Sequence, residues 1–288
     1  MNFTVIANCQ SGPIGTIISS MSQKLKYKPV KPIYLVNATD LIDYDKVIET
    51  TEIIIHQPIG LKFNQFAIEK IKLRFPDKLY ISFPSLYFLG YWPGMMYLRK
   101  PGGGTMKGIL GDHHDQRIVS AFLEGKSVMQ TTQLLSEPVQ NDFFEKEFLK
   151  LKTREESLDV KSSKFLIENF QRTKLFHVMN HPSNYLLIHV AMQIMKCLDI
   201  IPDKVSLENI NKQREYLNTF IAPVDIGVRR AIDITFKCDG NYYFISDNGS
   251  KKWTLKEYLD ASFMIYENES NLAEIFSHAL RLRLEMGY

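Results

Sequence analysis

The chain has 288 residues, 45% of them hydrophobic and 23% charged, so it can bury a substantial core in one large domain or in two packed ones. Its formal net charge is +3, from 35 basic and 32 acidic side chains that are mixed along the sequence. This mixture argues against nucleic acid as a partner. A local basic pocket for a phosphorylated ligand stays compatible with it.

The sequence also favours a cytoplasmic protein over an exported or membrane-spanning one. The first ten residues, MNFTVIANCQ, lack the charged leader, apolar core and cleavage site of a signal peptide. The longest apolar stretch, Tyr185–Leu198, is shorter than the roughly 20 residues that cross a membrane. Three cysteines without a CxxC pair are typical of a reducing compartment.

Residues 1–115 predict an α/β domain with a parallel sheet and flanking helices, as in SGNH or flavodoxin-like folds. We expect strands over Phe3–Ala7, Ile33–Val36, Glu52–His56 and Lys78–Phe83. We expect the intervening helices over Ile14–Leu25, Asp40–Glu49 and Phe63–Phe75.

Residues 116–288 predict a mainly helical region packed on that domain. We expect helices over Gln116–Leu123, Val128–Leu135, Asp142–Leu151, Lys164–Phe170, Ser183–Leu198, Leu255–Met264 and Asn271–Leu284. The range Ala231–Ser246 predicts a β-hairpin turning at Asp239-Gly240-Asn241, because Asp-Gly favours such turns. The irregular segment Leu86–Gly111, rich in aromatic residues, Gly and Pro, is interpreted as a binding loop or lid.

Three chemically rich segments follow expected strands, the third being Phe83-Pro84-Ser85 after the fourth strand, and parallel sheets bind ligands at the carboxyl ends of their strands. Asn8-Cys9-Gln10 follows the first strand and precedes a helix, whose positive end can lower the pKa of the Cys9 thiol and stabilise an anion. The plain alternative is a small buried cysteine. His56-Gln57 follows the third strand, where a histidine can move a proton and a glutamine can donate to a carbonyl oxygen. Both can equally cap strand ends.

Gly12 and Gly15 give a GxxG spacing at the entrance of the first helix. This spacing would let a phosphate or another substrate group approach the backbone, although it also suits a plain turn. Farther along, Arg154 lies in a helical region where basic side chains usually face solvent. A phosphorylated ligand would nevertheless need an arginine or lysine of this kind.

Two histidine-containing segments are further candidates. Gly111–Asp115 (GDHHD) is the densest titratable cluster, but adjacent histidines point in different directions and no third ligand has metal-site spacing, so no metal is expected. We expect Asp115 to cap a helix and one histidine to bind a ligand. His181 lies at a loop-to-helix junction and is a candidate general base. Its neighbour Asn184 can be an ordinary cap.

Six segments follow one another in the order VIANCQSGPI, IIHQPIG, SFPSLYFLGYWPG, GDHHDQRI, LKTREESLDV and LFHVMNHPSN. Their order and spacing, over about residues 3–200, resemble the motif series of the WcbI family of polysaccharide-biosynthesis acetyltransferases. The resemblance implies acetyl-coenzyme A as donor and a sugar hydroxyl of a bacterial capsule or surface polysaccharide as acceptor. It also suggests a protein peripheral to a polysaccharide assembly complex.

On this basis we expect the catalytic residues to be Cys9, Gln10, His56, Gln57 and His181. We expect coenzyme A to contact Asn8, Gly12, His113, Arg154, Asn180 and Asn184.

Three alternatives stay open. A looser resemblance to SGNH hydrolases, with Cys9 in place of their serine and Val178 in place of their aspartate, makes carbohydrate ester hydrolysis the nearest rival. A non-catalytic assembly factor that binds coenzyme A or a nucleotide is the second. The third concerns the route: the sugar attacks the thioester directly, or Cys9 first accepts the acetyl group. We favour direct transfer, because no carboxylate that would orient a Cys-His pair is evident.

Overall fold

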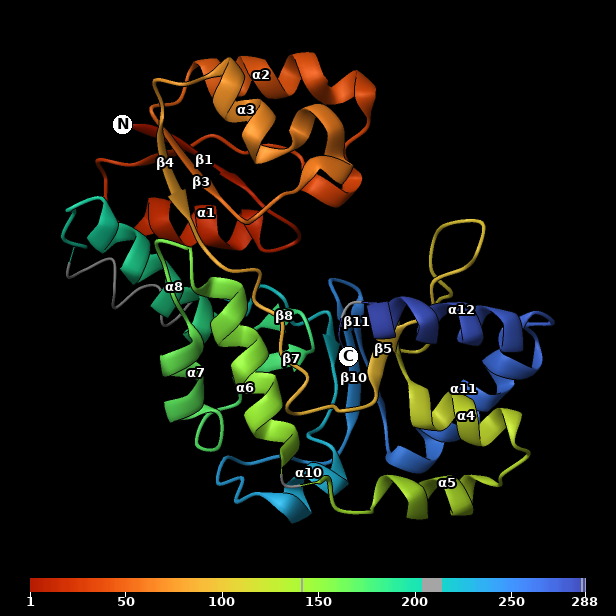
Figure 1. Cartoon of the computed structure of the whole chain (residues 1–288). Coiled ribbons are helices and arrows are strands. Elements are labelled where there is room, and N and C mark those ends of the chain that lie inside the picture. The colour runs from red at the N-terminus through yellow and green to blue at the C-terminus, as the bar shows by residue number, and fades with distance from the viewer. Residues whose placement is uncertain (141, 204–213, 286, 288) are drawn as a thin grey trace. The chain divides into compact units, whose positions relative to one another are not determined.

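The computed structural model describes residues 1–140, 142–203, 214–285 and 287, which group into two compact units. Within them, unit 1 comprises 1–87, 148–169 and 182–217, and unit 2 comprises 88–147, 170–181 and 218–288. The segments of the units alternate along the chain (Figure 1), whereas the sequence suggested consecutive regions. No described helix is long and apolar enough to span a membrane.

Unit 1 contains the expected parallel sheet. Its strand order is β2-β1-β3-β4, formed by β1 (Asn2–Ile6), β2 (Lys26–Tyr27), β3 (Ile53–His56) and β4 (Leu79–Ser82). Ile6 pairs with His56, and His56 pairs with Ser82, so the carboxyl ends of three strands are level. The loops that follow these strands therefore begin at one edge of the sheet.

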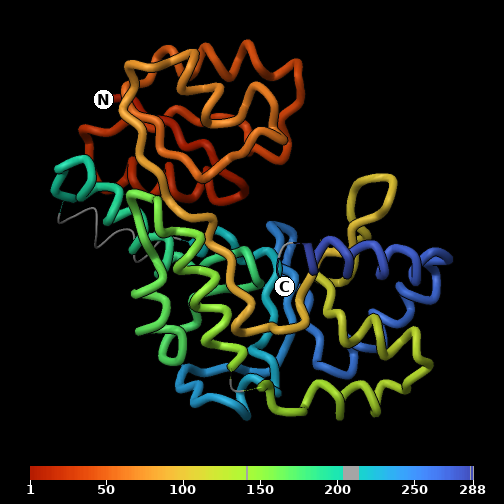
Figure 2. The backbone as a smooth tube through the Cα atoms, in the orientation of Figure 1, coloured from red at the N-terminus to blue at the C-terminus, as the bar shows by residue number. Residues whose placement is uncertain are grey.

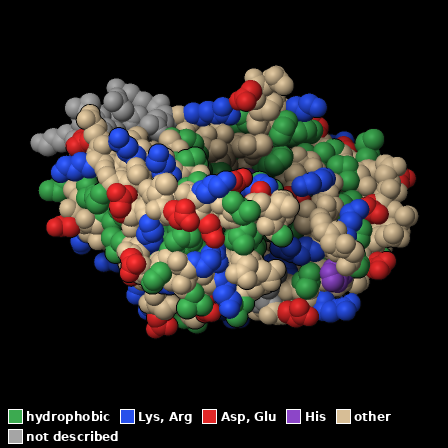
Figure 3. All heavy atoms as spheres, turned by 90° about the horizontal axis from the view of Figure 1, so that it is seen from above, with side chains coloured by type: hydrophobic (Ala, Val, Ile, Leu, Met, Phe, Trp, Pro, Cys, Tyr) green, Lys and Arg blue, Asp and Glu red, His purple; other side chains and the backbone are tan. Residues whose placement is uncertain are grey.

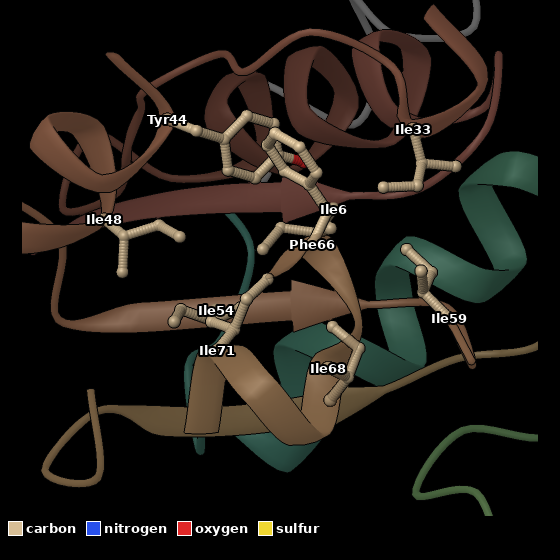
Figure 4. Packing of buried hydrophobic residues seen from close by; sticks show 9 residues of the cluster. All are labelled: Ile6, Ile33, Tyr44, Ile48, Ile54, Ile59, Phe66, Ile68 and Ile71. Carbon is tan, nitrogen blue, oxygen red and sulfur yellow. The ribbon is translucent and has the colours of Figure 1, made fainter. Parts of the chain in front are cut away.

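Helices cover both faces of this sheet, with α2 (Leu41–Glu49) and α3 (Ile68–Arg74) on one face and α1 (Ser11–Met21) on the other (Figure 1). A cluster of buried apolar side chains from the sheet, α2, α3 and their loops fills the first face (Figure 4). Its members are Ile6, Ile33, Tyr44, Ile48, Ile54, Ile59, Phe66, Ile68 and Ile71. Unit 1 is completed by α7 (Ser163–Asn169) and α8 (Asn184–Cys197), the latter close to the predicted range.

The expected strand over Ile33–Val36 is wrong, because Ile33–Leu35 is a short 3-10 helix, η1. Pro32 precedes it, and Asn37 caps a second short helix, η2 (Ala38–Asp40), that follows. The Ile33 side chain enters the core while Tyr34 and Leu35 stay exposed. Four apolar residues between a proline and a helix cap thus supply one core contact rather than a strand.

Unit 2 combines small antiparallel sheets with helices. Its strands are β5 (Met95–Tyr97), β6 (His113–Asp115), β7 (Phe176–Val178), β9 (Phe220–Ile221), β10 (Tyr242–Ser246) and β11 (Gly249–Trp253), and β8 (His181–Pro182) lies where the two units meet in the sequence. Its helices are α4 (Gln116–Leu123), α5 (Val128–Leu135), α10 (Ile226–Ala231), α11 (Leu255–Glu267) and α12 (Leu272–Glu285), while α6 (Asp142–Glu155) belongs partly to each unit. The expected helices Gln116–Leu123 and Val128–Leu135 are confirmed to the residue.

The predicted hairpin over Ala231–Ser246 is wrong in position. The hairpin consists of β10 and β11, with Tyr242 opposite Trp253 and Ser246 opposite Gly249. At the predicted turn, Asp239 Oδ1 accepts from the backbone N–H of Asn241, but this local turn only leads into β10. A turn signal in the sequence does not specify which flanks pair, and the second edge of β10 pairs with β9 instead.

The aromatic part of Leu86–Gly111 is buried core rather than a lid. Phe88 and Tyr91 are at most 1% exposed, and their rings meet edge to face at 5.7 Å. The glycine-rich tip near Gly102–Gly104 is exposed, as are Arg99 and Lys107 beside it, and the tip projects as the yellow loop in Figure 2. The interpretation of the segment as a lid is therefore wrong for its aromatic residues.

Surface charges are mixed. On the face drawn in Figure 3, basic and acidic side chains are interspersed. Some charged side chains of the protein pair with an opposite charge in the same helix, such as Lys256 with Asp260 at 2.8 Å. Exposed pairs of this kind contribute little to stability, so they chiefly keep charges of both signs distributed over the surface.

Candidate functional site

Two buried side-chain amides join the strand ends of unit 1. Gln57 Nε2 donates to Gln10 Oε1 at 2.8 Å, and the backbone N–H of Asn8 donates to Gln57 Oε1 at 3.1 Å. Gln10 is 0% exposed and Gln57 4%. The loops after β1 and β3 are thus held together by one buried and one partly buried hydrogen bond.

The loop after β4 joins the same network. Gln10 Nε2 donates to the Leu86 carbonyl at 2.8 Å, while Gln10 Oε1 accepts from the Leu86 N–H at 3.2 Å. Asn8 Nδ2 donates to Ser85 Oγ at 3.3 Å. We call the set Asn8, Cys9, Gln10, Gln57 and Ser85 the strand-end cluster. Because both ends of the Gln10 amide are occupied by Leu86, Gln10 is placed to position the loops.

Cys9 lies within this cluster, directly before Gln10, the N-cap of α1. Its side chain is a free, partly exposed thiol. Burial raises the pKa of Cys9 to about 11, although a backbone hydrogen bond acts in the opposite direction. The expectation that the helix end lowers this pKa is wrong, because loss of water around the thiolate outweighs the stabilisation from backbone groups. Cys9 is therefore a neutral thiol near pH 7.

His56 ends β3 and is only 6% exposed. Its Nδ1 lies 3.0 Å from the Gln57 carbonyl oxygen, and its ring meets Tyr80 edge to face at 6.1 Å. Burial lowers the pKa of His56, so the ring is neutral near pH 7 and Nδ1 carries the proton that it donates to the carbonyl. His56 is thus a histidine held in one tautomer beside the strand-end cluster.

The two glycines of the GxxG spacing differ in their surroundings. A Cβ on Gly15 would lie 2.3 Å from the Tyr27 ring, so Gly15 is required for packing between α1 and β2. A Cβ on Gly12 would meet nothing within 4 Å. The space beside the Gly12 Cα, in the first turn of α1, is therefore not filled by another part of the described chain.

Arg154 and Asn184 also belong to unit 1. Arg154 is exposed, donates from Nη2 to the Tyr87 carbonyl at 2.7 Å and stacks over the Tyr87 ring, two residues after Ser85 of the strand-end cluster. Asn184 accepts from the N–H of Tyr216 at 3.1 Å and donates to the carbonyl of Arg214 at 3.0 Å. Since backbone groups occupy both ends of its amide, Asn184 has a clear role in holding residues 214–216.

The other expected site residues form a separate cluster in unit 2. His113 Nδ1 lies 2.9 Å from the Leu110 carbonyl oxygen, and His113 Nε2 lies 2.7 Å from Asn180 Oδ1. The His181 ring is edge-on to the His113 ring, with centroids 5.5 Å apart. Burial lowers the pKa of His113, although its hydrogen bonds to Asn180 and Leu110 act in the opposite direction. We call His113, Asn180 and His181 the histidine cluster.

His114, next in sequence, serves the fold. Its Nε2 lies 3.1 Å from the Met106 carbonyl oxygen and its Nδ1 lies 3.0 Å from Tyr266 Oη, which fits one neutral tautomer. Burial lowers the pKa of His114 to about 4. No group of three His, Cys, Asp or Glu side chains among the described residues is arranged to hold a metal ion.

A buried ion network in unit 2 was not foreseen. Asp115 caps α4 as expected, accepting from the N–H of Arg117 at 2.8 Å. The Arg117 guanidinium also binds the carboxylates of Asp115 and Asp225. Burial acts to raise the pKa of Asp115, but Arg117 overcomes this and holds it below its usual value. Asp225 lies 108 residues from Arg117, so the sequence carried no local signal for this contact.

The profile of the family described as "Polysaccharide biosynthesis enzyme WcbI" matches residues 2–203, which include both clusters. The chain belongs to the WcbI family. The fold agrees with a solved WcbI structure, described as a novel polysaccharide biosynthesis enzyme in a native form without a disulfide bond between coenzyme A and a cysteine. That structure has a TM-score of 0.79 and 17% identity, covering 96% of this chain and 94% of the WcbI chain. A search of curated proteins gives no match.

Proposed function

We propose that this member of the WcbI family transfers an acetyl group from acetyl-coenzyme A to a sugar hydroxyl in the synthesis of a bacterial surface polysaccharide. Family membership supports a role in polysaccharide biosynthesis. The description of the similar structure names coenzyme A together with a cysteine of that protein. The observation that carries the proposal is the strand-end cluster, in which Cys9 directly precedes the buried Gln10 at the start of α1 and Gln10 is hydrogen-bonded to the buried Gln57.

The residues of unit 1 fit the donor. The backbone at Gly12 and the side-chain amide of Asn8 would bind the thioester end of the donor. The exposed Arg154 would donate hydrogen bonds to its phosphate oxygens. Bound acetyl-coenzyme A supplies an activated carbonyl and a thiolate leaving group. One amide N–H of Gln57 is donated to Gln10 and one of Gln10 to Leu86, so either glutamine would stabilise the oxyanion through its second N–H.

The neutral thiol of Cys9 favours direct transfer over an acetyl-cysteine intermediate. In the direct route, the sugar oxygen forms the new C–O bond as a histidine accepts its proton. The thioester C–S bond then breaks, and the proton ends on the coenzyme A sulfur, so the histidine is regenerated. The base is either His56 or His181, and asparagine variants of each distinguish them by their effect on turnover.

The test uses acetyl-coenzyme A carrying a ¹³C-labelled acetyl group and a panel of sugars and sugar nucleotides. The label is expected on a sugar hydroxyl, with coenzyme A released only when an acceptor is present. An acetyl adduct on Cys9 before any acceptor is added would overturn the direct route. Hydrolysis of acetylated sugars without transfer would instead establish an esterase. Ligand binding without turnover, together with full cellular function of Cys9→Ala protein, would establish an assembly factor.

Exposed Cys197 provides the matched control. Cys197→Ala is expected to leave acetyl-coenzyme A binding and turnover unchanged, whereas Cys9→Ala is expected to weaken both because Cys9 lies at the start of α1, in the loop that the strand-end hydrogen bonds hold. A thermal shift measures binding independently of turnover, since a ligand that binds only the folded protein raises its apparent stability.

A further inference from the structure

Unit 2 contains a cavity of about 130 Å³ between the segments 92–135 and 222–258. One water molecule needs roughly 10–15 Å³ by the same measure, so the cavity has room for a group of about ten heavy atoms. This is the size of one sugar ring. The cavity reaches the surface beside Arg229, whose side chain is exposed and forms part of its wall.

One part of the wall is aromatic and rigid. Trp92 is 4% exposed, and its Nε1 donates to the Pro223 carbonyl at 2.6 Å. Tyr258 stacks on Tyr242, with ring centroids 3.9 Å apart and ring planes within 5° of parallel. Aromatic faces held in one orientation give a flat apolar surface on which the C–H face of a pyranose ring can pack.

The polar part of the wall is balanced in charge. Asp115 and Asp225 both line the cavity, and Arg117 binds both carboxylates. Arg229 lies at the mouth, so the two acidic groups, Asp115 and Asp225, are balanced by two basic ones, Arg117 and Arg229. His113 also lines the cavity and is neutral. A wall of this kind offers fixed acceptors for hydroxyl groups without favouring a cation or an anion.

The cavity adjoins the histidine cluster, because His113 belongs to both. The His181 ring, a candidate base for the acceptor hydroxyl, is edge-on to the His113 ring at 5.5 Å. We propose that this cavity binds a neutral pyranose ring of the sugar acceptor, with the ring packed on Trp92 and Tyr258. The assignment of this ring to the sugar acceptor rests on the proposed acetyl transfer, but binding of a pyranose in the cavity can be measured independently of that reaction.

The chain has only two tryptophans, which makes the test direct. Protein labelled with 5-fluorotryptophan gives one fluorine resonance for Trp92 and one for Trp253, which lies on β11 and does not line the cavity. Trp253→Phe assigns them. Methyl glucoside and methyl galactoside are the neutral probes, and methyl glucuronide and glucosamine are the charged ones. A neutral probe is expected to shift the Trp92 resonance in a saturable way and by more than the Trp253 resonance, because Trp253 meets the cavity only through its strand partner Tyr242.

Two substitutions on α5 locate the binding. Leu135 is buried and lines the cavity, so Leu135→Phe fills it and is expected to weaken the glycoside response by about tenfold or more. Met129 is 69% exposed on the same helix, so Met129→Phe is expected to keep the full response. Should Leu135→Phe fail to fold, Val224→Ile adds a single methyl group to another part of the wall and is expected to weaken the response in the same direction.

The inference is overturned if no neutral glycoside shifts Trp92, if the charged probes bind more tightly, or if both filling variants keep the full response. These results are separable from the proposed function. Acetyl transfer to a sugar without any Trp92 response would refute only the assignment of this cavity as the acceptor site. A normal Trp92 response without acetyl-coenzyme A binding or turnover would refute only the proposed acetyl transfer.

Discussion

The side chains of Gln57 and Gln10 share one hydrogen bond of 2.8 Å, which joins the loops after two adjacent strands, β3 and β1. Gln57 belongs to the loop after β3, and it also accepts from Asn8 in the loop after β1. Gln10 in turn binds both backbone groups of Leu86 after β4. A substitution of either glutamine is therefore expected to disturb all three loops at this edge of the sheet.

Replacing Gln57 by Glu is expected to lower the free energy of unfolding by about 1–3 kcal/mol, because a carboxylate oxygen would face Gln10 Oε1 with no proton to donate. Urea unfolding at pH 7 measures the loss. Gln65→Glu, at an exposed position of the same unit, should change stability by less than about 0.5 kcal/mol. Equal effects of the two substitutions would show that the buried amide pair has no special role.

The Cys9 thiol is expected to react slowly with iodoacetamide. With its pKa raised to about 11 by burial, the thiolate fraction at pH 8 is about one hundredth of that of a thiol at the ordinary value of 9.0. The rate should rise about tenfold per pH unit up to pH 10. Peptide mass spectrometry of Cys197→Ser, Cys238→Ser protein gives the rate for Cys9 alone. A rate that levels off below pH 9 would contradict the raised pKa.

Acid is expected to destabilise the protein in part through His114. Its pKa falls from 6.5 in the unfolded chain to about 4 in the folded one, so its contribution is complete above pH 6.5 and is lost as the pH falls towards 4. Between pH 7 and pH 5 this loss is about 2 kcal/mol. The His114→Gln variant should therefore show a correspondingly shallower pH dependence of urea unfolding. Parallel curves for the two proteins would rule the contribution out.

Gly94→Ala is expected to destabilise the fold through the buried ion network. A Cβ at this position would lie 2.1 Å from Asp115 Oδ1 and 2.8 Å from Arg117 Nε, so the pair would have to move. We expect a loss of about 2–4 kcal/mol, since displacing one partner of a buried ion pair leaves charge uncompensated. Gly102→Ala is the control, because a Cβ there meets nothing within 4 Å. Similar melting temperatures for both variants would refute this account.

The sequence predicted those parts of the fold whose signals are local. The helices α4 and α5 begin after the caps Asp115 and Ser127 and show a clear apolar period, so their bounds could be stated in advance. The strand expected over Ile33–Val36 and the hairpin over Ala231–Ser246 failed, because short apolar runs and turn signals do not determine which segments pair.

The candidate site was predictable to the same extent. Placing Asn8 and Gln57 close together followed from the rule that parallel strands end at one edge, and their hydrogen bond agrees with it. Their catalytic role stays a prediction. Two other features of the structure could not be predicted because they depend on tertiary packing. These are the raised pKa of Cys9 and the contact between Arg117 and Asp225, neither of which is indicated by the residues adjacent in the sequence.

The alternation of the two units along the chain bears on how the protein emerges from the ribosome. The chain passes from one unit to the other five times, and the last segment of unit 1 ends at residue 217. The sheet strands of unit 1 leave the ribosome early, but that unit cannot be complete until three quarters of the protein has been synthesised. The two units therefore cannot fold one after the other during translation. Each unit consists of three separated segments, so any continuous fragment that contains all of one unit also contains part of the other.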